Sequence, residues 1–217
     1  LPNKLQKQFN SLEENPDAVI CSHNVREITS DSTMRERSYW FYSGGQYSIL
    51  DLLKKLPFFA HSSKFFRVDE HLDWNELLKH PYTLDIEIHV EQARSGSILH
   101  LEEDLGLYRI NTGVSSISSC KINAKIEERV FLTYEKSLAR YPQFKIDILK
   151  AYASYLLNMA NNYAVIEGNK GKFKFYTKRS LNLAFFSVKQ ILMLLLTIYP
   201  SFGIYICRKR AGYNTIR

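Results

Sequence analysis

Cysteine is scarce in this sequence, and its placement excludes two kinds of site. The 217 residues include three cysteines, Cys21, Cys120 and Cys207, which lie far apart and form no CxxC pair. An odd number of widely spaced cysteines predicts neither a zinc site built on paired cysteines nor a disulfide framework. The sequence therefore favours a reducing, cytoplasmic-side location.

The sequence also lacks the short motifs that identify an enzyme on their own. It has no Gly-rich phosphate loop, no HExxH and no GxSxG. Its six histidines are scattered, and without a partner ligand at helical spacing each is expected to be an ordinary surface or core residue. It begins at Leu1, without Met or an apolar secretory signal, so we expect the chain to start inside a longer protein.

Apolar and basic residues, in contrast, are plentiful. Apolar types make up 45% of the chain, which is enough to fill a core, so disorder is not expected. Lysine and arginine number 29 against 22 aspartates and glutamates, which gives a net charge of +7. This surplus suits anionic partners such as lipid head groups, nucleotide diphosphates or nucleic acid, without choosing among them.

The first half of the sequence alternates helical and strand signals. Apolar residues at helical spacing predict helices, and short β-prone runs bounded by turn residues predict strands. The pattern predicts an α/β fold up to about residue 113. Helices are expected at residues 3–14, 49–56 and 84–93, and strands at residues 18–23, within 58–68, at 97–101 and at 105–110.

The strand signals end near residue 121, and the rest of the sequence is predicted to be helical. Apolar residues there recur at i, i+4 spacing, as in Ile126, Val130, Tyr134 and Leu138. We therefore expect two regions, residues 1–116 and residues 117–217, of which the second is helical and associates with a membrane.

Residues 181–206 are strongly apolar and have basic residues on both sides. Spanning a bilayer takes about 20 predominantly apolar residues, but Lys189 and Gln190 interrupt this run and Pro200 would break a helix. The basic flanks favour an anionic membrane surface. Interfacial or re-entrant association, a true span and a buried helical hairpin all remain open. We expect a protein on the cytoplasmic side of the inner membrane, either peripheral or anchored by residues 181–206.

Three segments, taken in their order and spacing, resemble the family 2 glycosyltransferases of bacterial polysaccharide and lipopolysaccharide assembly. The first is PNKLQKQF at residues 2–9, the second is LDIE at residues 84–87, and the third is LYRINTGVSS at residues 107–116. In the third segment Asn111 stands where the family often has histidine. The resemblance covers residues 1 to about 116.

This resemblance implies a fold and a reaction. The fold would be the C-terminal half of a GT-A domain, whose donor-binding strands would lie upstream of Leu1, so residues 18–23 are expected to form an unpaired sheet edge. The reaction would move a sugar, with inversion, from a nucleotide-sugar donor to a lipid-linked or saccharide acceptor. It would use a divalent cation, Mg²⁺ or Mn²⁺, whose main ligands would also lie upstream, and this chain alone could lack activity.

The resemblance also implies roles for individual residues. Inverting transfer needs a carboxylate that removes the proton of the acceptor hydroxyl, and Asp85 is the candidate for this base. The alternative for Asp85 is a first-turn carboxylate favoured by the helix dipole, and Glu87 projects from another side of the same helix. Arg109 is expected either to pair with the diphosphate or to be solvated. His61 and Ser62 either belong to an acceptor-binding segment or form a polar turn.

Two other classes of protein are the alternatives to a glycosyltransferase. A non-catalytic, membrane-peripheral interaction protein would bind anionic lipid through its basic tail and use the α/β part for docking. Nucleic-acid binding is not expected, because the basic residues border an apolar run instead of alternating with exposed aromatic residues.

Overall fold

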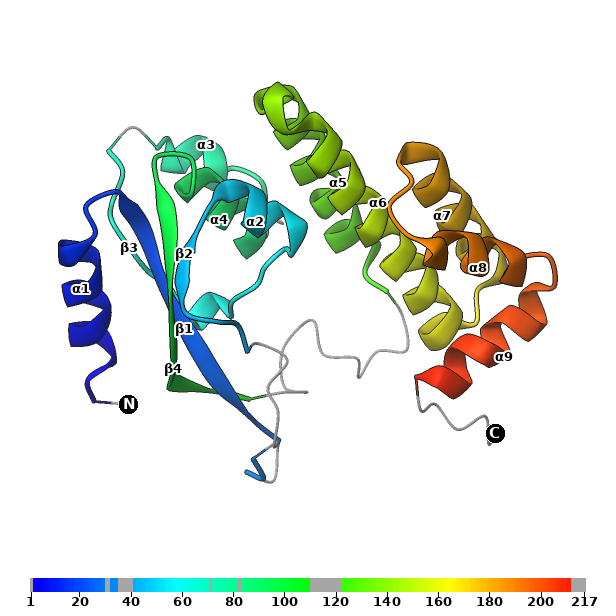
Figure 1. Cartoon of the computed structure of the whole chain (residues 1–217), viewed down its shortest axis with the longest axis horizontal. Coiled ribbons are helices and arrows are strands. Elements are labelled where there is room, and N and C mark those ends of the chain that lie inside the picture. The colour runs from blue at the N-terminus through cyan, green and yellow to red at the C-terminus, as the bar shows by residue number, and fades with distance from the viewer. Residues whose placement is uncertain are drawn as a thin grey trace. The chain divides into compact units, whose positions relative to one another are not determined.

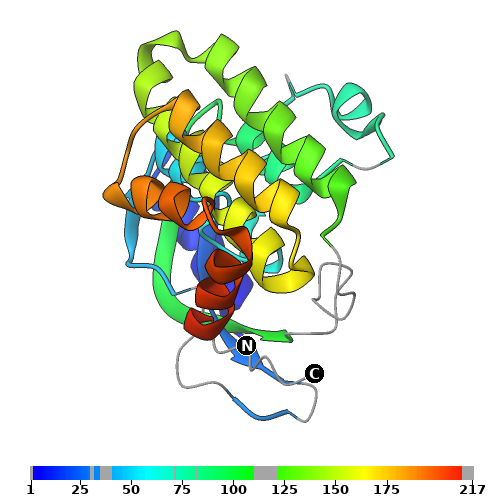
Figure 2. The ribbon, with the colours of Figure 1, turned by 90° about the vertical axis from the view of Figure 1, so that its right-hand side faces the viewer.

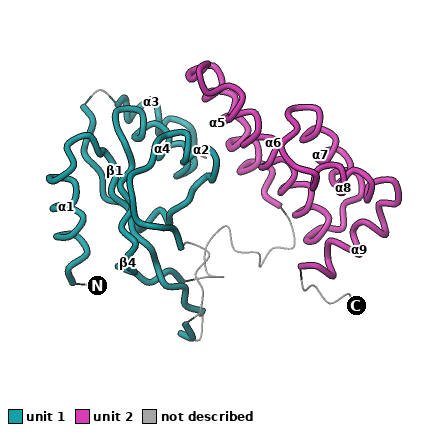
Figure 3. The backbone as a smooth tube through the Cα atoms, in the orientation of Figure 1, with its two compact units in different colours: residues 1–116 teal, residues 117–217 magenta. Residues whose placement is uncertain are grey.

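The computed structural model describes residues 2–29, 32–34, 41–70, 72–81, 83–109 and 122–211. The chain is α/β and divides into two compact units, residues 1–116 and residues 117–217 (Figure 3). Unit 1 contains the sheet, and the described residues of unit 2 are helical.

Unit 1 is built on a mixed sheet whose described strands follow the order β2-β4-β1-β3. The long strands β1 (Ala18–Ile28) and β4 (Ser97–Arg109) pair in parallel. The short strands β2 (Gly45–Tyr47) and β3 (Phe65–Phe66) add antiparallel pairs to β4 and β1. Because β1 lies between β4 and β3, the prediction that it forms an unpaired sheet edge is wrong.

Residues 97–109 form one strand where the sequence predicted two. The acidic residues Glu102, Glu103 and Asp104 lie within β4, where the pairing with β1 shifts in register. Glu103 pairs with Lys7, and Asp104 accepts a hydrogen bond from Arg26 Nε at 2.9 Å. Exposed acidic side chains with cationic partners can stay on a strand, so they do not require a turn. The strand pair predicted within residues 58–68 is likewise reduced to the 3-10 helix η1 (His61–Ser63) and the two residues of β3.

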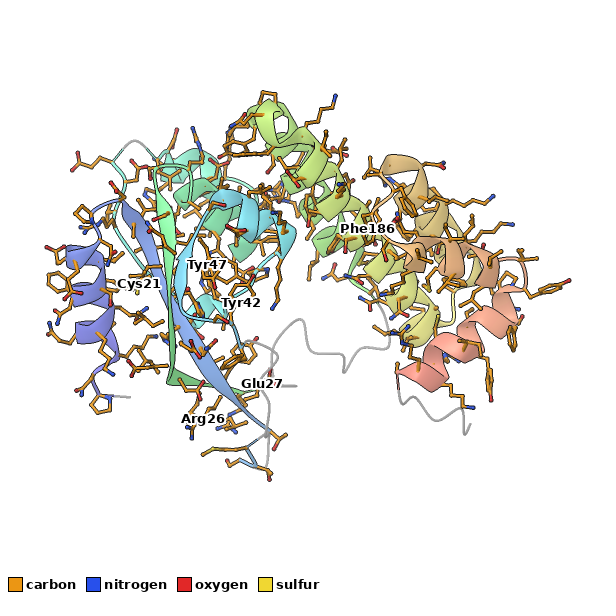
Figure 4. The ribbon with its side chains drawn as sticks, in the orientation of Figure 1. Cys21, Arg26, Glu27, Tyr42, Tyr47 and Phe186 are labelled. Carbon is orange, nitrogen blue, oxygen red and sulfur yellow. The ribbon has the colours of Figure 1, made fainter. Side chains whose placement is uncertain are left out.

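Helices cover both faces of the sheet. The helix α1 (Lys4–Glu14) lies on one side, and α2 (Ile49–Lys54) and α4 (Asp85–Gln92) lie on the other (Figure 1). On the α1 side Leu12 packs with Ala18 and Cys21 in a small core. Figure 4 shows Cys21 on that side and Tyr42 and Tyr47 on the opposite one. The remaining helix of the described part of unit 1 is α3 (Trp74–Leu78).

Unit 2 is a bundle in which α6 packs against both α5 and α7 (Figure 2). Stacked aromatic rings fill its core, with ring centroids 4.9 Å apart for Tyr134 and Tyr152 and 5.4 Å apart for Tyr163 and Tyr176. The described elements are α5 (Ala124–Arg140), η2 (Pro142–Phe144), α6 (Lys145–Asn162), η3 (Tyr163–Glu167), α7 (Lys170–Leu183), α8 (Val188–Leu196) and α9 (Pro200–Arg210).

The apolar segment predicted at residues 181–206 is divided between the end of α7 and two short helices. Pro200 begins α9 at a position where a helix tolerates proline, so it separates two helices instead of breaking one. Gln190 is buried, and its amide binds Ser180 Oγ at 3.0 Å and the Ala184 carbonyl at 2.9 Å. Among the described helices, none is both long enough and apolar enough to cross a membrane.

Candidate functional site

Three side chains with metal-binding or acid-base chemistry meet beside α4. His61 comes from η1, and Asp85 and His89 lie one turn apart on α4. His61 Nδ1 is 3.9 Å from Asp85 Oδ2 and 3.5 Å from His89 Nε2. We call these three residues the His-Asp-His cluster. It unites Asp85 and His61, two of the residues to which the resemblance gave roles.

The first turn of α4 assigns different tasks to its two carboxylates. Glu87 Oε2 accepts a hydrogen bond from the backbone N–H of Leu84 at 2.9 Å, and the Glu87 residue is 6% exposed. The Asp85 side chain is 46% exposed, and its Oδ1 accepts from the backbone N–H of Ile86 at 2.9 Å. Glu87 therefore caps the helix from a buried position, whereas Asp85 has an oxygen facing His61 and access to solvent.

His89 is the buried member of the cluster. Its ring lies against the ring of Phe59, with centroids 4.8 Å apart, and Lys64 Nζ is 3.1 Å from its Nδ1. Burial, together with the charges of Lys64 and His61, lowers the pKa of His89 to about 2. Burial also lowers the pKa of Lys64 to about 8, although nearby Asp85 opposes this shift. His89 is therefore neutral near pH 7, and the Lys64 ammonium lies against it.

The other two predicted site residues, Ser62 and Arg109, lie outside the His-Asp-His cluster. Ser62 is next to His61 and exposed, and its carbonyl accepts from Lys4 Nζ at 2.7 Å. Arg109 ends β4 opposite Ile28 and donates to the Thr29 carbonyl at 3.3 Å. Strand β3 pairs with β1 at Ile20 and Cys21, whereas Arg109 pairs with Ile28 at the other end of β1. Because η1 directly precedes β3, and because each strand residue spans about 3.3 Å, several residues of β1 separate Arg109 from the cluster. Asn111 lies outside the described residues.

His89, Lys64 and Gln92 were not predicted to be site residues. Lys64 Nζ binds Gln92 Oε1 at 2.5 Å as well as His89. A signal for His89 was present, because Asp85 and His89 are separated by four residues, the spacing at which side chains meet on one face of a helix. Lys64 had no such signal, since only the folding of η1 against α4 brings it to this helix.

A second polar group lies inside the sheet. His100 Nδ1 is 2.8 Å from Ser22 Oγ, and His100 Nε2 is 3.0 Å from Asn24 Oδ1. The Asn24 amide donates to the carbonyls of Tyr42 and Glu102, which fixes its oxygen toward His100. His100 therefore carries its hydrogen on Nε2 and accepts from Ser22.

The order serine, histidine and asparagine resembles a nucleophile with its base, but the three residues are at most 1% exposed. Burial lowers the pKa of His100 to about 4, helped by His23 and Lys55. Because a substrate cannot reach a fully buried hydroxyl, we interpret this group as a structural link between the two long strands and the chain at Tyr42.

The resemblance puts the main ligands of its divalent cation upstream of Leu1, so that cation stays a prediction. Mg²⁺ and Mn²⁺ prefer ligand sets made of oxygen atoms. In the described part of the chain, the one group of metal-binding side chains that come together is the His-Asp-His cluster, which offers two nitrogen atoms and one carboxylate.

Comparison of the chain with protein-family models, with curated proteins and with solved structures finds no match.

Proposed function

We propose that this chain is part of a glycosyltransferase that works at an anionic membrane surface. The observation that supports the transferase reading is the meeting of His61 with Asp85 at 3.9 Å. The two residues come from separate segments of the sequence, and the resemblance assigns the first to the acceptor and the second to the base. The described structure of unit 1 is also compatible with this reading in being α/β.

The chemistry asked of Asp85 is modest and local. In an inverting transfer the acceptor hydroxyl attacks the anomeric carbon while a carboxylate takes its proton, and the nucleotide diphosphate leaves with the bonding electrons. Asp85 is half exposed, so an acceptor hydroxyl can reach it from solvent. His61, which is also half exposed, is placed to hydrogen-bond the acceptor or to orient the carboxylate.

The test replaces Asp85 by Asn in the product of the complete gene, whatever that gene encodes beyond the 217 residues. Turnover is measured as nucleoside diphosphate released from a panel of nucleotide sugars in the presence of lipid-linked and saccharide acceptors. We expect turnover to fall by about 10² to 10⁴ with donor binding nearly unchanged, because an amide cannot take the proton.

Glu87→Gln is the matched control, since Glu87 lies on the same turn of α4 but is buried as a cap. It should lower stability by about 1 kcal/mol and leave the turnover of the folded protein near normal. Unchanged turnover in Asp85→Asn would remove Asp85 from the mechanism. A protein that shows no transfer with any donor, yet still binds membranes, would support the non-catalytic alternative.

The membrane part of the proposal rests on a set of exposed apolar side chains on α8, on α9 and between them. Their exposed fractions run from 43 to 75%. A large exposed apolar surface on a folded protein is typical of a binding site for another apolar phase. We call this set the apolar face; it consists of Val188, Ile191, Leu192, Leu195, Ile198, Tyr199, Phe202 and Tyr205.

Lipid is the occupant that best matches the surroundings of the apolar face. On α8 the exposed residues follow the i, i+3, i+4, i+7 spacing of a single helix side, as an interfacial helix requires. Exposed Lys189, Lys209 and Arg210 lie on the same two helices and suit anionic head groups. The test is flotation of the purified chain with vesicles. We expect it to float with anionic vesicles and far less with zwitterionic ones, and absence from both would refute membrane docking.

A further inference from the structure

We propose that the His-Asp-His cluster binds a divalent transition-metal ion, of which Zn²⁺ is the probe used below. One ligand atom from each of His61, Asp85 and His89 lies within 4.8 Å of the other two. The three atoms come from two elements, η1 and α4, so the site exists only in the folded unit.

The spacing of the ligand atoms matches a small tetrahedral ion. Zinc binds imidazole nitrogen and carboxylate oxygen at about 2.0–2.1 Å, which places the ligand atoms of a tetrahedron about 3.4 Å apart. The distance from His61 Nδ1 to His89 Nε2 is 3.5 Å, and that from His61 Nδ1 to Asp85 Oδ2 is 3.9 Å. Two of the three separations are thus within about 0.5 Å of the tetrahedral value, and the third, between Asp85 and His89, is within 4.8 Å. Movement of the half-exposed His61 and Asp85 side chains can close the site on an ion.

The ligand types determine the class of ion. Two imidazoles with one carboxylate suit zinc, cobalt, nickel or iron, whereas magnesium and calcium are bound by oxygen ligands. Three protein ligands leave at least one coordination position open to water or to another small ligand. Because the side chains of His61 and Asp85 are 52% and 46% exposed, that position is accessible from solvent.

Two of the three ligands are held ready by α4. Asp85 and His89 are one helical turn apart, and His89 is fully buried against Phe59. A buried ring with a fixed orientation loses little freedom on binding a metal, and outer contacts of this kind tune metal affinity. His61 is the adaptable ligand, because it lies on the surface of a three-residue helical turn.

Lys64 is the residue that opposes the metal. Its Nζ lies 3.1 Å from His89 Nδ1, so it donates to that nitrogen and the ring hydrogen sits on Nε2, the atom that faces His61. A metal at Nε2 requires this hydrogen to move to Nδ1, and the Lys64 ammonium, which lies 3.1 Å from Nδ1, must then withdraw. Removing the charge of Lys64 should therefore strengthen binding, whereas removing a ligand should weaken it.

Metal binding would also act on the proposed reaction, and this step rests on the proposed function. A cation on Asp85 occupies the carboxylate oxygen that would take the acceptor proton, so a bound ion should inhibit transfer. The cluster would then couple sugar transfer to the concentration of free transition metal. Binding of the ion itself does not depend on the enzyme activity.

The test titrates Zn²⁺ into the purified, chelator-treated chain by calorimetry, with Co²⁺ as a spectroscopic probe of tetrahedral geometry. Loss of an outer-sphere partner alone costs about 10- to 100-fold in metal affinity, so His61→Ala and Asp85→Asn should each weaken binding at least about tenfold. Lys64→Met, which keeps an apolar stem beside Phe66, should bind several-fold more tightly. His80→Ala, an exposed histidine outside the cluster, should match the wild type.

Equal zinc affinity in the wild type and His61→Ala, or no saturable binding by the wild type, would overturn the proposal. Thermal melting of each variant separates lost binding from lost folding. The two proposals fail in different ways: zinc binding without any sugar transfer would leave the metal site standing, and transfer that is insensitive to zinc in a protein that binds no zinc would leave the transferase standing.

Discussion

Units 1 and 2 differ in their buried histidines and in their exposed apolar residues. Unit 1 buries polar groups such as Asn24, His89 and His100, whereas unit 2 exposes the apolar face of α8 and α9. All six histidines and both tryptophans belong to unit 1, and unit 2 has neither. In a soluble protein, buried polar groups and extended exposed apolar surface are the observations that carry information about function.

In both units, hydrogen bonds hold the buried polar side chains in place. In unit 1 the Asn24 side chain joins His100 to the carbonyls of Tyr42 and Glu102, so these particular buried polar atoms satisfy one another. In unit 2 the buried Gln190 fixes α8 to the end of α7, and the apolar side of α8 remains outside.

The largest effect is expected from removing the apolar face. Replacing Leu192, Leu195, Ile198 and Phe202 by Ser should reduce binding to anionic vesicles by roughly 10³-fold, since each side chain contributes on the order of 1 kcal/mol or more when it enters the lipid. Because these residues are already exposed, the midpoint of urea unfolding should change little. Undiminished flotation of the folded variant would contradict a role of the apolar face in membrane binding.

As the pH is lowered, unit 1 should unfold before unit 2. The pKa of His100 is lowered to about 4 in the folded state, against about 6.5 when unfolded, so the unfolded chain binds more protons between these values. Stability from this group is complete above pH 6.5 or so and is lost as the pH falls toward 4, by about 3 kcal/mol at most. The pKa values of His23 and His89 are lowered in the same direction.

The two units can be followed separately in this titration. Tryptophan fluorescence reports on unit 1 alone, because Trp40 and Trp74 are the tryptophans of the chain, while far-ultraviolet circular dichroism is dominated by the helices of unit 2. We expect the fluorescence transition at higher pH than the helical one. In His100→Gln the acid sensitivity of unit 1 should be smaller, and transitions that coincide in both proteins would show that histidine burial does not set the order.

The buried amide of unit 2 gives the next effect. Gln190→Ala removes hydrogen bonds to Ser180, Ala184 and Phe186 at once, which should cost about 2–3 kcal/mol of unfolding free energy. It should also speed amide hydrogen exchange in α8. The neighbouring Lys189→Ala, on the exposed side of the same helix, serves as the control and should change stability by less than about 0.5 kcal/mol. Equal losses in both variants would mean that Gln190 does not fix α8.

The sequence predicted those parts of the fold that local patterns determine. The helices at α1, α2 and α4 were predicted within a few residues, because apolar spacing and the stops at Asn15, Pro57 and Ser95 are local signals. The strand prediction at Phe58 and Phe59 was wrong, because both residues are buried in irregular chain and not on a strand. Apolar runs indicate burial, and they do not by themselves distinguish a strand from a packed loop.

The candidate site divides in the same way. The proximity of Asp85 and His89 follows from their spacing of four residues on one helix. The approach of His61 and Lys64 instead depends on how η1 packs beside α4. The interior position of β1 could not be predicted either, because its parallel partner β4 follows about seventy residues later and parallel pairing leaves no local turn signal.

The smallest effect is expected from individual basic residues of unit 2, and their contacts indicate which ones to test. Arg179 donates to the Tyr152 hydroxyl at 3.0 Å, and Arg208 donates to the Val165 carbonyl at 3.0 Å, so both are structural. Lys189, Lys209 and Arg210 are exposed on α8 and α9. Replacing each of these three by Gln should weaken binding to anionic vesicles by about 1 kcal/mol, and added salt should erase the difference. Arg208→Gln should instead lower the unfolding free energy, because α9 loses the hydrogen bond from Arg208 to the Val165 carbonyl of η3. If the three surface variants bound as tightly as the wild type at low salt, unit 2 would attach through its apolar face alone and the anionic character of the membrane would be irrelevant.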